Sequence, residues 1–261
     1  MIHVKLVAMG CIVSELDMFR VKRWKSNLFT IDQEVKRYIL PPKADLRYWG
    51  YSDKLLKRVL PLPYHGKEDC PDLIFYILDA PIQNNFFSRI LSENRIVISY
   101  YEVNHILHEE NIPLENLLIS LIYSYTLLYL ANRKRVLTMK GEERIVHDHR
   151  EGCLYDMCGN KEDVIYSSVH PIICEPCKAY LMQHGVAVDD IEIASNELKR
   201  LKRNLYYRMV HYLRSYPDIV FVLTCSLSII LNFVASNQKW AYAILICAIY
   251  TTVRLLIHYK H

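Results

Sequence analysis

The sequence predicts an α/β or α+β domain with a four-cysteine zinc module, followed by a basic helix and a C-terminal hairpin of two transmembrane helices. Three observations lead to this fold class: strand-like apolar runs near the start, two close cysteine pairs in the middle, and two long apolar runs at the end. The 261 residues are 52% hydrophobic and 23% charged, with only 7 glycines. This composition excludes disordered and collagen-like proteins.

Residues 1–140 are predicted to form the α/β body. Residues 1–11 alternate between apolar and polar side chains, and residues 72–79 are a continuous apolar run typical of a strand that is buried on both faces. Residues 95–101 have the same strand character. These segments predict a sheet, and the alternation at the start argues against a signal peptide, so we expect the body to be cytosolic.

Helices are expected over residues 32–38, 53–59, 102–110 and 114–131. The last of these is almost wholly apolar, so it is either a core helix or a further membrane span. Its serine, threonine and tyrosine hydroxyls favour a buried core helix.

Residues 141–186 contain the zinc module. Cys153 and Cys158 form a Cys-x4-Cys pair, and Cys174 and Cys177 form a Cys-x2-Cys pair after an intervening segment of 15 residues. Four thiolates at such spacings suit a closed tetrahedral Zn²⁺ site, and disulfides are rare in the cytosol. The sequence therefore predicts these four cysteines as structural zinc ligands.

The cysteine order, with isoleucine before Cys174 and Leu181 after Cys177, resembles the structural zinc module of the archaemetzincin-like metallopeptidases. The resemblance covers residues 147–181. In that family a catalytic His-Glu-x-x-His helix precedes the cysteines. Here His108-Glu109 is followed by Ile112 where the second histidine would stand, and residues 114–131 contain no histidine. The resemblance thus implies a zinc module without the peptidase centre.

A catalytic alternative uses four other residues around the first cysteine pair. His147 and His149 would share one face of an extended segment and supply two imidazoles, with Asp156 as a third ligand. Glu151 or Asp148 would be the base for an activated water. A histidine or carboxylate of this group is also a candidate to replace one cysteine in the structural site.

Residues 187–217 predict a basic amphipathic connector helix. Its apolar stripe of Leu198, Leu201, Leu205, Met209 and Leu213 packs either on its own domain or on a second copy of the chain. Its cations precede an apolar run, so we expect contact with anionic lipids. The cations predicted to make that contact are Lys199, Arg200, Lys202 and Arg203.

Residues 218–261 contain the predicted hairpin. The apolar runs 219–236 and 240–258 are each long enough for a helix that crosses the bilayer core, and Arg254 lies near the end of the second run. The excess of cations before the hairpin predicts a multi-pass protein of the cell inner membrane with both termini in the cytoplasm.

These features together predict a membrane-anchored zinc-binding protein that acts as a non-enzymatic sensor or effector, of a bacterial defence type, whose cytosolic domain binds a ligand or partner. Two alternatives are a membrane-tethered metallopeptidase-like hydrolase and a membrane-tethered nucleic-acid binder. The nucleic-acid alternative is disfavoured because the formal net charge is only +4 and the 20 tyrosines are spread along the chain.

Overall fold

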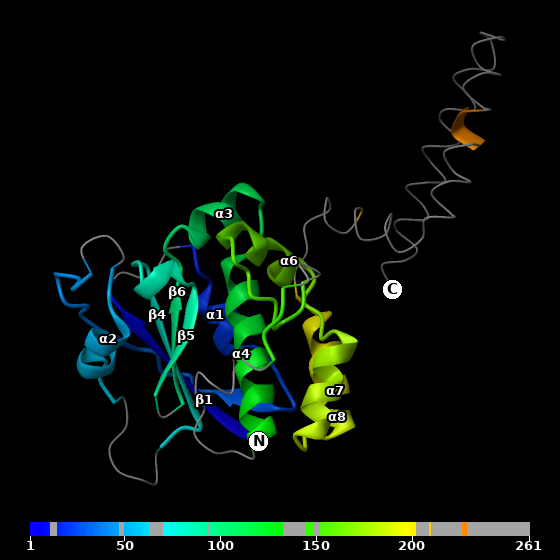
Figure 1. Cartoon of the computed structure of the whole chain (residues 1–261), viewed down its shortest axis with the longest axis horizontal. Coiled ribbons are helices and arrows are strands. Elements are labelled where there is room, and N and C mark those ends of the chain that lie inside the picture. The colour runs from blue at the N-terminus through cyan, green and yellow to red at the C-terminus, as the bar shows by residue number, and fades with distance from the viewer. Residues whose placement is uncertain are drawn as a thin grey trace. The chain divides into compact units, whose positions relative to one another are not determined.

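The computed structural model describes residues 1–10, 15–46, 50–62, 70–92, 94–132, 145–148, 152–201, 209 and 226–228. Residues Met1–Asn204 form one compact unit, which therefore includes the segment 141–186 that the sequence sets apart. This unit is a mixed α/β fold, as predicted (Figure 1). Nearly all of the predicted hairpin, residues 218–261, lies outside the described residues.

The sheet has the strand order β2-β1-β4-β6-β5, and β3 pairs with a further part of β1. All strand pairs are parallel except β5 with β6. The strands are β1 (Ile2–Met9), β2 (Phe29–Ile31), β3 (Lys36–Tyr38), β4 (Leu73–Leu78), β5 (Ser88–Ser92) and β6 (Arg95–Ser99). The three predicted strands are thus confirmed as β1, β4 and β6.

The helix predicted over residues 32–38 is wrong. Lys36–Tyr38 form the strand β3, which pairs in parallel with Val7–Met9 of β1. The Asp32 side chain accepts a hydrogen bond from the backbone N–H of Glu34 at 3.0 Å, a local turn that competes with a helix start. The segment is also too short for its propensity to outweigh pairing with a buried strand.

Helices cover both faces of the sheet. The helices of the body are α1 (Met18–Lys22), α2 (Asp53–Val59), α3 (Val103–Glu109) and α4 (Leu114–Ala131), and a 3₁₀ turn η1 spans Gln83–Asn85. The later elements are the 3₁₀ turn η2 (Lys161–Asp163) and the helices α6 (Val164–Val169), α7 (Glu175–Gln183) and α8 (Val188–Leu198). The predicted helices at 53–59, 102–110 and 114–131 are confirmed as α2, α3 and α4.

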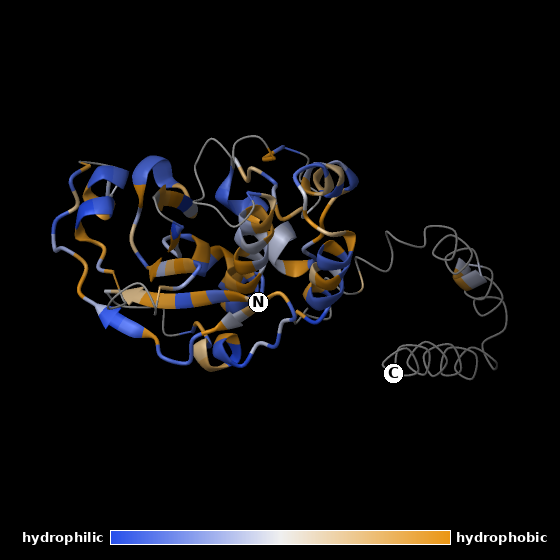
Figure 2. Ribbon diagram, turned by 90° about the horizontal axis from the view of Figure 1, so that it is seen from below, coloured by the Kyte–Doolittle hydropathy of each residue, from blue (hydrophilic) through white to orange (hydrophobic). Residues whose placement is uncertain are grey.

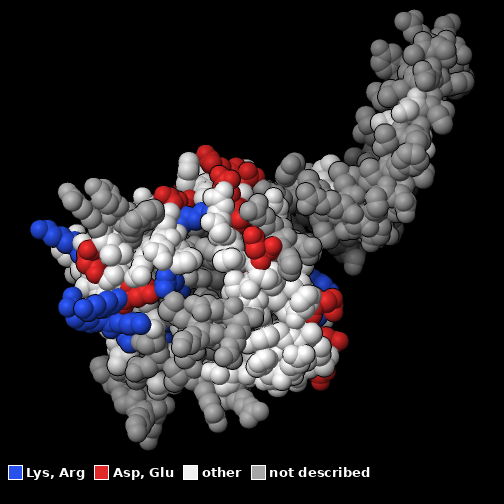
Figure 3. All heavy atoms as spheres, in the orientation of Figure 1, with Lys and Arg blue, Asp and Glu red and all other residues white. Residues whose placement is uncertain are grey.

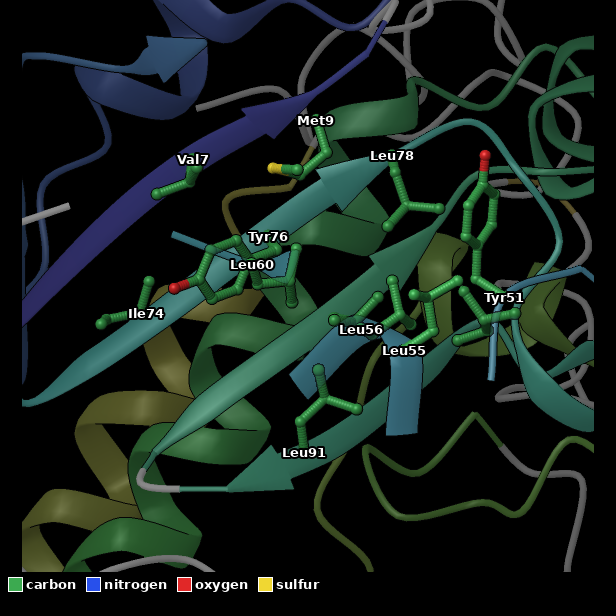
Figure 4. Close-up of a cluster of buried hydrophobic side chains, with 12 residues drawn as sticks. Val7, Met9, Tyr51, Leu55, Leu56, Leu60, Ile74, Tyr76, Leu78 and Leu91 are labelled. Atoms are coloured by element: carbon green, nitrogen blue, oxygen red, sulfur yellow. The ribbon is translucent and has the colours of Figure 1, made fainter. Parts of the chain in front are cut away.

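Alternate residues of the central strands point to opposite faces, as the pleat of a strand requires. Tyr76 of β4 belongs to the buried cluster that packs against Leu55 and Leu56 of α2 (Figure 4). Its neighbour Phe75 faces the other side, where its ring meets Tyr125 of α4 with centroids 5.9 Å apart. Figure 2 shows the resulting apolar interior, which lies along the sheet and α4.

Helix α4 is the only element among the described residues that is long and apolar enough to cross a membrane, and 89% of it is buried inside the structure. Its polar groups find partners within the same unit. Ser120 donates to the Ser167 carbonyl at 3.3 Å, and the Tyr129 hydroxyl donates to Asp72 at 2.9 Å. The helix is therefore packed as a core helix, which is the arrangement that the sequence favours.

The connector helix predicted over residues 187–217 is present in its first part as α8, but it is not continuous, because α8 ends at Leu198 and residues 199–201 form a turn. Leu198 and Leu201 of the predicted stripe are buried in the compact unit, whereas Met209 is exposed. Leu205 and Leu213 lie outside the described residues. The start of the connector thus packs on its own domain.

Candidate metal centre

Four side chains from residues 147–177 gather in one cluster. They are His147, Cys153, Cys174 and Cys177, and their donor atoms all lie within 4.8 Å of one another. Cys153 and Cys177 are buried, while His147 and Cys174 are partly exposed at the edge. The structure therefore contains a possible metal site in the module that the sequence predicts.

Cys153 is positioned by a short bridge to the segment before α7. The N–H of Leu154 donates to the Ile172 carbonyl at 2.9 Å, and the N–H of Ile172 donates to the Gly152 carbonyl at 3.0 Å. Gly152 has a φ of +82°, and a Cβ there would lie 2.8 Å from the carbonyl oxygen of Tyr166. Only glycine suits this turn, which delivers Cys153 into the cluster.

Cys174 and Cys177 are positioned by the start of α7. Cys174 is the N-cap residue, its carbonyl accepts from the N–H of Lys178 at 2.9 Å, and Cys177 follows in the first turn. Pro176 suits the first turn, where the backbone N–H groups have no partner within the helix. The first turn of α7 therefore places both cysteines at the N-terminal end of one helix.

Two of the separations between donor atoms are close to the edges of a tetrahedral site. Cys153 Sγ lies 3.8 Å from Cys177 Sγ, and Cys174 Sγ lies 3.3 Å from His147 Nε2. A tetrahedral ion with zinc–sulfur bonds of ~2.3 Å has a sulfur–sulfur edge of ~3.8 Å and a sulfur–nitrogen edge of ~3.5 Å. The donor atoms are therefore spaced for one small ion.

The Asp156 carboxylate contacts the His147 imidazole through the ring nitrogen that does not face the sulfur atoms. His147 Nδ1 lies 3.1 Å from Asp156 Oδ1, so the other ring nitrogen, Nε2, faces the sulfur atoms. Asp156 Oδ2 also accepts from the backbone N–H groups of Gly152 and Cys153, both at 2.9 Å. Such a partner fixes the orientation of a metal-binding histidine and raises its basicity.

The thiols also depart from their usual acidity. The hydrogen bond with Cys177 lowers the pKa of Cys153 to about 5, whereas burial raises the pKa of Cys174. Three sulfur atoms so close together cannot all ionise without a compensating positive charge. A bound cation would supply that charge and keep the thiols deprotonated.

Cys158, which the sequence predicts as a ligand, is not part of this group. It lies in a turn with a φ of 46°, and burial together with the nearby Asp156 and Asp163 raises the pKa of its thiol to about 12. The chain around it pairs with His147 instead, because the N–H of Met157 donates to the His147 carbonyl at 2.7 Å. The imidazole therefore stands where the fourth thiolate was expected.

Of the four catalytic candidates, two lie among the described residues and two do not. His147 lies in the cluster, and Asp156 contacts the imidazole and backbone N–H groups rather than joining the four donors. His149 and Glu151 lie outside the described residues. The sequence makes a member of this histidine and carboxylate group a candidate substitute for one cysteine, and the structure places His147 among the donors.

The cluster is attached directly to the buried helix α4. The Tyr155 hydroxyl donates to the Ser124 carbonyl at 3.1 Å, and the Ser124 hydroxyl donates to the Leu154 carbonyl at 3.4 Å. The Asn116 side chain donates to the Ser168 carbonyl at 3.1 Å. An ion bound here would hold the module closed over the polar side of α4.

Comparison of the chain with protein-family models, with curated proteins and with solved structures finds no match.

Proposed function

We propose that this protein is a membrane-anchored zinc protein without enzymatic activity, in which zinc holds the module around Cys153 and Cys177 against α4. The cytosolic body would bind a ligand or partner and act as a sensor or effector at the bilayer. The observation that carries the proposal is the set of four donors, His147, Cys153, Cys174 and Cys177, at the spacing of a small tetrahedral ion.

The chemistry of the donors supports zinc. Three thiolates and one imidazole are a common ligand set of structural zinc sites, whereas calcium and magnesium prefer oxygen ligands. The Asp156 carboxylate next to His147 adds the outer contact that such sites use. Zinc is therefore the ion that we propose for this protein.

The same donors argue against catalysis at this ion. A catalytic zinc has three protein ligands and one open position for water, whereas four protein donors fill a tetrahedron. The metallopeptidase-like alternative requires His147 together with His149, but His147 already belongs to the group with the cysteines. We extend the archaemetzincin-like resemblance only to a structural zinc module.

Membrane attachment is proposed from residues 218–261. Their two apolar runs and the cations before them indicate a hairpin with the body on the cytoplasmic side. A folded body that is joined to such a hairpin can couple the binding of a ligand to a change at the bilayer, and a second copy of the chain is the simplest partner of the hairpin.

Metal analysis of the purified full chain tests the zinc proposal. We expect about one zinc per chain, and we expect the same content in the His149→Ala variant because His149 is not one of the four donors. A second exchangeable metal that disappears in His149→Ala would support the hydrolase instead.

Membrane extraction tests the anchor. The full chain should stay in the membrane fraction in high salt and alkaline carbonate, since insertion of an apolar helix is effectively irreversible. Deletion of residues 218–261 should release the protein into the soluble fraction. Extraction of the full chain without detergent would contradict the hairpin and leave the zinc site untouched.

A further inference from the structure

A hollow with cationic and aromatic walls lies beside α1. It has a volume of about 480 Å³, which is within the range of small-ligand sites. Asp17, the one acidic residue among the described residues of its wall, caps α1 and accepts from the N–H of Arg20 at 2.9 Å. The lining residues are Asp17, Phe19, Arg20, Arg23, Trp24, Lys25 and Arg200.

Two of the cations build the walls. Arg20 is paired with the buried Glu115 of α4 at 2.5 Å. The Arg200 guanidinium stacks over the Trp24 ring at 4.8 Å, lies 3.8 Å from Glu197 and donates to the Lys25 carbonyl. These contacts fix the hollow to the folded body, because they join α1 to α4 and the turn after α8 to the segment after α1.

The other two cations are available to a ligand. Arg23 and Lys25 are exposed, and within the part of the chain that the structure describes neither is paired with a carboxylate. The Arg23 guanidinium lies 4.7 Å above the Phe19 ring, which is itself 63% exposed. An exposed aromatic ring among cations has the composition of a surface that meets lipid headgroups.

The position of the hollow in the chain favours the same ligand. Arg200 belongs both to the hollow and to the run of cations at residues 199–203 that precedes the predicted hairpin. Binding of a soluble phosphate compound would not require the hollow to lie near the predicted hairpin in the sequence. A lipid headgroup would, because the hairpin would hold the body near the bilayer surface.

We propose that this hollow binds the phosphate group of anionic membrane lipids, with Arg23 and Lys25 as the phosphate contacts and Phe19 in the headgroup layer. The inference rests on the proposed membrane attachment, and it adds a specific site in the folded body to the contacts expected from the connector.

The test uses the full chain in a zwitterionic detergent and a titration with short-chain phosphatidylglycerol, followed by hydrogen exchange of residues 17–25. Exchange should slow with phosphatidylglycerol and not with phosphatidylcholine of the same chain length. In the Arg23→Gln/Lys25→Gln double variant, the half-saturating concentration should rise roughly 30-fold, the equivalent of ~1 kcal/mol for each cation.

A matched control is available on α2. Lys54 and Lys57 are exposed and line a separate hollow of about 630 Å³, on the side where Lys and Arg gather in Figure 3. The Lys54→Gln/Lys57→Gln variant has the same change in charge and should titrate like the unmodified chain. An equal loss in this control would overturn the site, because the effect would then follow net charge alone.

Two further outcomes would also overturn the proposal. Exchange that is insensitive to phosphatidylglycerol would remove the site, and equal protection by glycerol phosphate would assign it to a soluble ligand. Failure of the anchor is distinguished by carbonate extraction of the full chain. In that event, the site would still predict sedimentation with phosphatidylglycerol vesicles that is weakened by the Arg23→Gln/Lys25→Gln variant.

Discussion

The sheet and the candidate metal module differ in how much regular structure they contain. In the sheet, every residue of β4 is buried, and strands pair along β1, β4 and β6. Among its described residues the module has isolated bridges, such as those between His147 and Asp156 and between Cys153 and Ile172, and short helices. Burial of apolar surface stabilises both regions, and the zinc that we propose would add its binding free energy to the module alone.

The largest effect is expected from the loss of a metal ligand. The Cys177→Ser variant replaces a buried thiolate with a weak ligand, so the zinc should be lost and the module should unfold from α4. Apparent zinc-binding free energies of ~10–16 kcal/mol in small zinc domains are large compared with the whole stability of an ordinary domain. Metal content and the thermal midpoint measure the effect.

Cys158→Ser is the matched control for that variant, because Cys158 lies outside the four donors. It should keep one zinc per chain, whereas His147→Ala should lose it. The reverse result, with zinc lost in Cys158→Ser and kept in His147→Ala, would restore the four-cysteine site that the sequence predicts.

A substitution in the apolar core beside the sheet should lower the stability of the fold without removing the metal. Leu56→Ala opens a cavity between α2 and the sheet, where Leu56 is fully buried in the cluster of Figure 4. We expect a loss of ~2–5 kcal/mol in the free energy of unfolding with no change in zinc content. Leu62→Ala, at a leucine that is 49% exposed, should change the stability little. Loss of zinc in Leu56→Ala would show that the two regions unfold together.

The same contrast explains what could be predicted from the sequence. Strands β1, β4 and β6 and the helices α2, α3 and α4 have local apolar patterns, and their positions were predicted. The strand β3 was missed because it depends on pairing with Val7–Met9, which is a non-local contact. The strand β2 has only three residues, which are too few for a periodic signal, and in β5 only Ile90 and Leu91 are apolar.

The candidate metal site likewise has donors that the local sequence pattern predicts and one that depends on a non-local contact. Three of the four candidate donors belong to the predicted cysteine pairs. Two of them, Cys174 and Cys177, lie together because both are at the start of α7. The fourth depends on a backbone contact between His147 and Met157 that no spacing rule encodes. The spacing of the cysteine pairs therefore predicts where the metal module lies in the chain, but it does not identify every ligand.

A smaller effect on zinc affinity is expected from Asp156, the carboxylate next to His147. Asp156→Asn keeps the size of the side chain but removes the charge next to His147 Nδ1. Zinc affinity should fall ~10–100-fold, as for other outer contacts of metal-binding histidines. Competition with a chelator measures the affinity. Asp163→Asn, which makes the same charge change in the capping box of η2, should leave the affinity unchanged.

The smallest effect concerns the contact that joins the two regions. Lys161 of η2 donates to the Tyr101 carbonyl at 2.7 Å and to Asn85 at 2.8 Å, and it lies 3.2 Å from Glu102. Hydrogen bonding from Asn85, followed by Lys161, outweighs burial and lowers the pKa of Glu102. A lowered pKa stabilises the fold above the usual value of 4.5, and this contribution is lost as the pH falls through the folded value.

The Lys161→Met variant should therefore raise the pKa of Glu102 only in part, because Asn85 still donates to it at 2.9 Å. The loss of stability should be ~1 kcal/mol or less, since Glu102 is half exposed. An NMR titration of the Glu102 carboxyl measures the pKa, and Lys178→Met, which breaks a pair within α7, should leave it unchanged. If the Lys161→Met variant also lowers zinc affinity, then the metal module depends on the sheet for its shape.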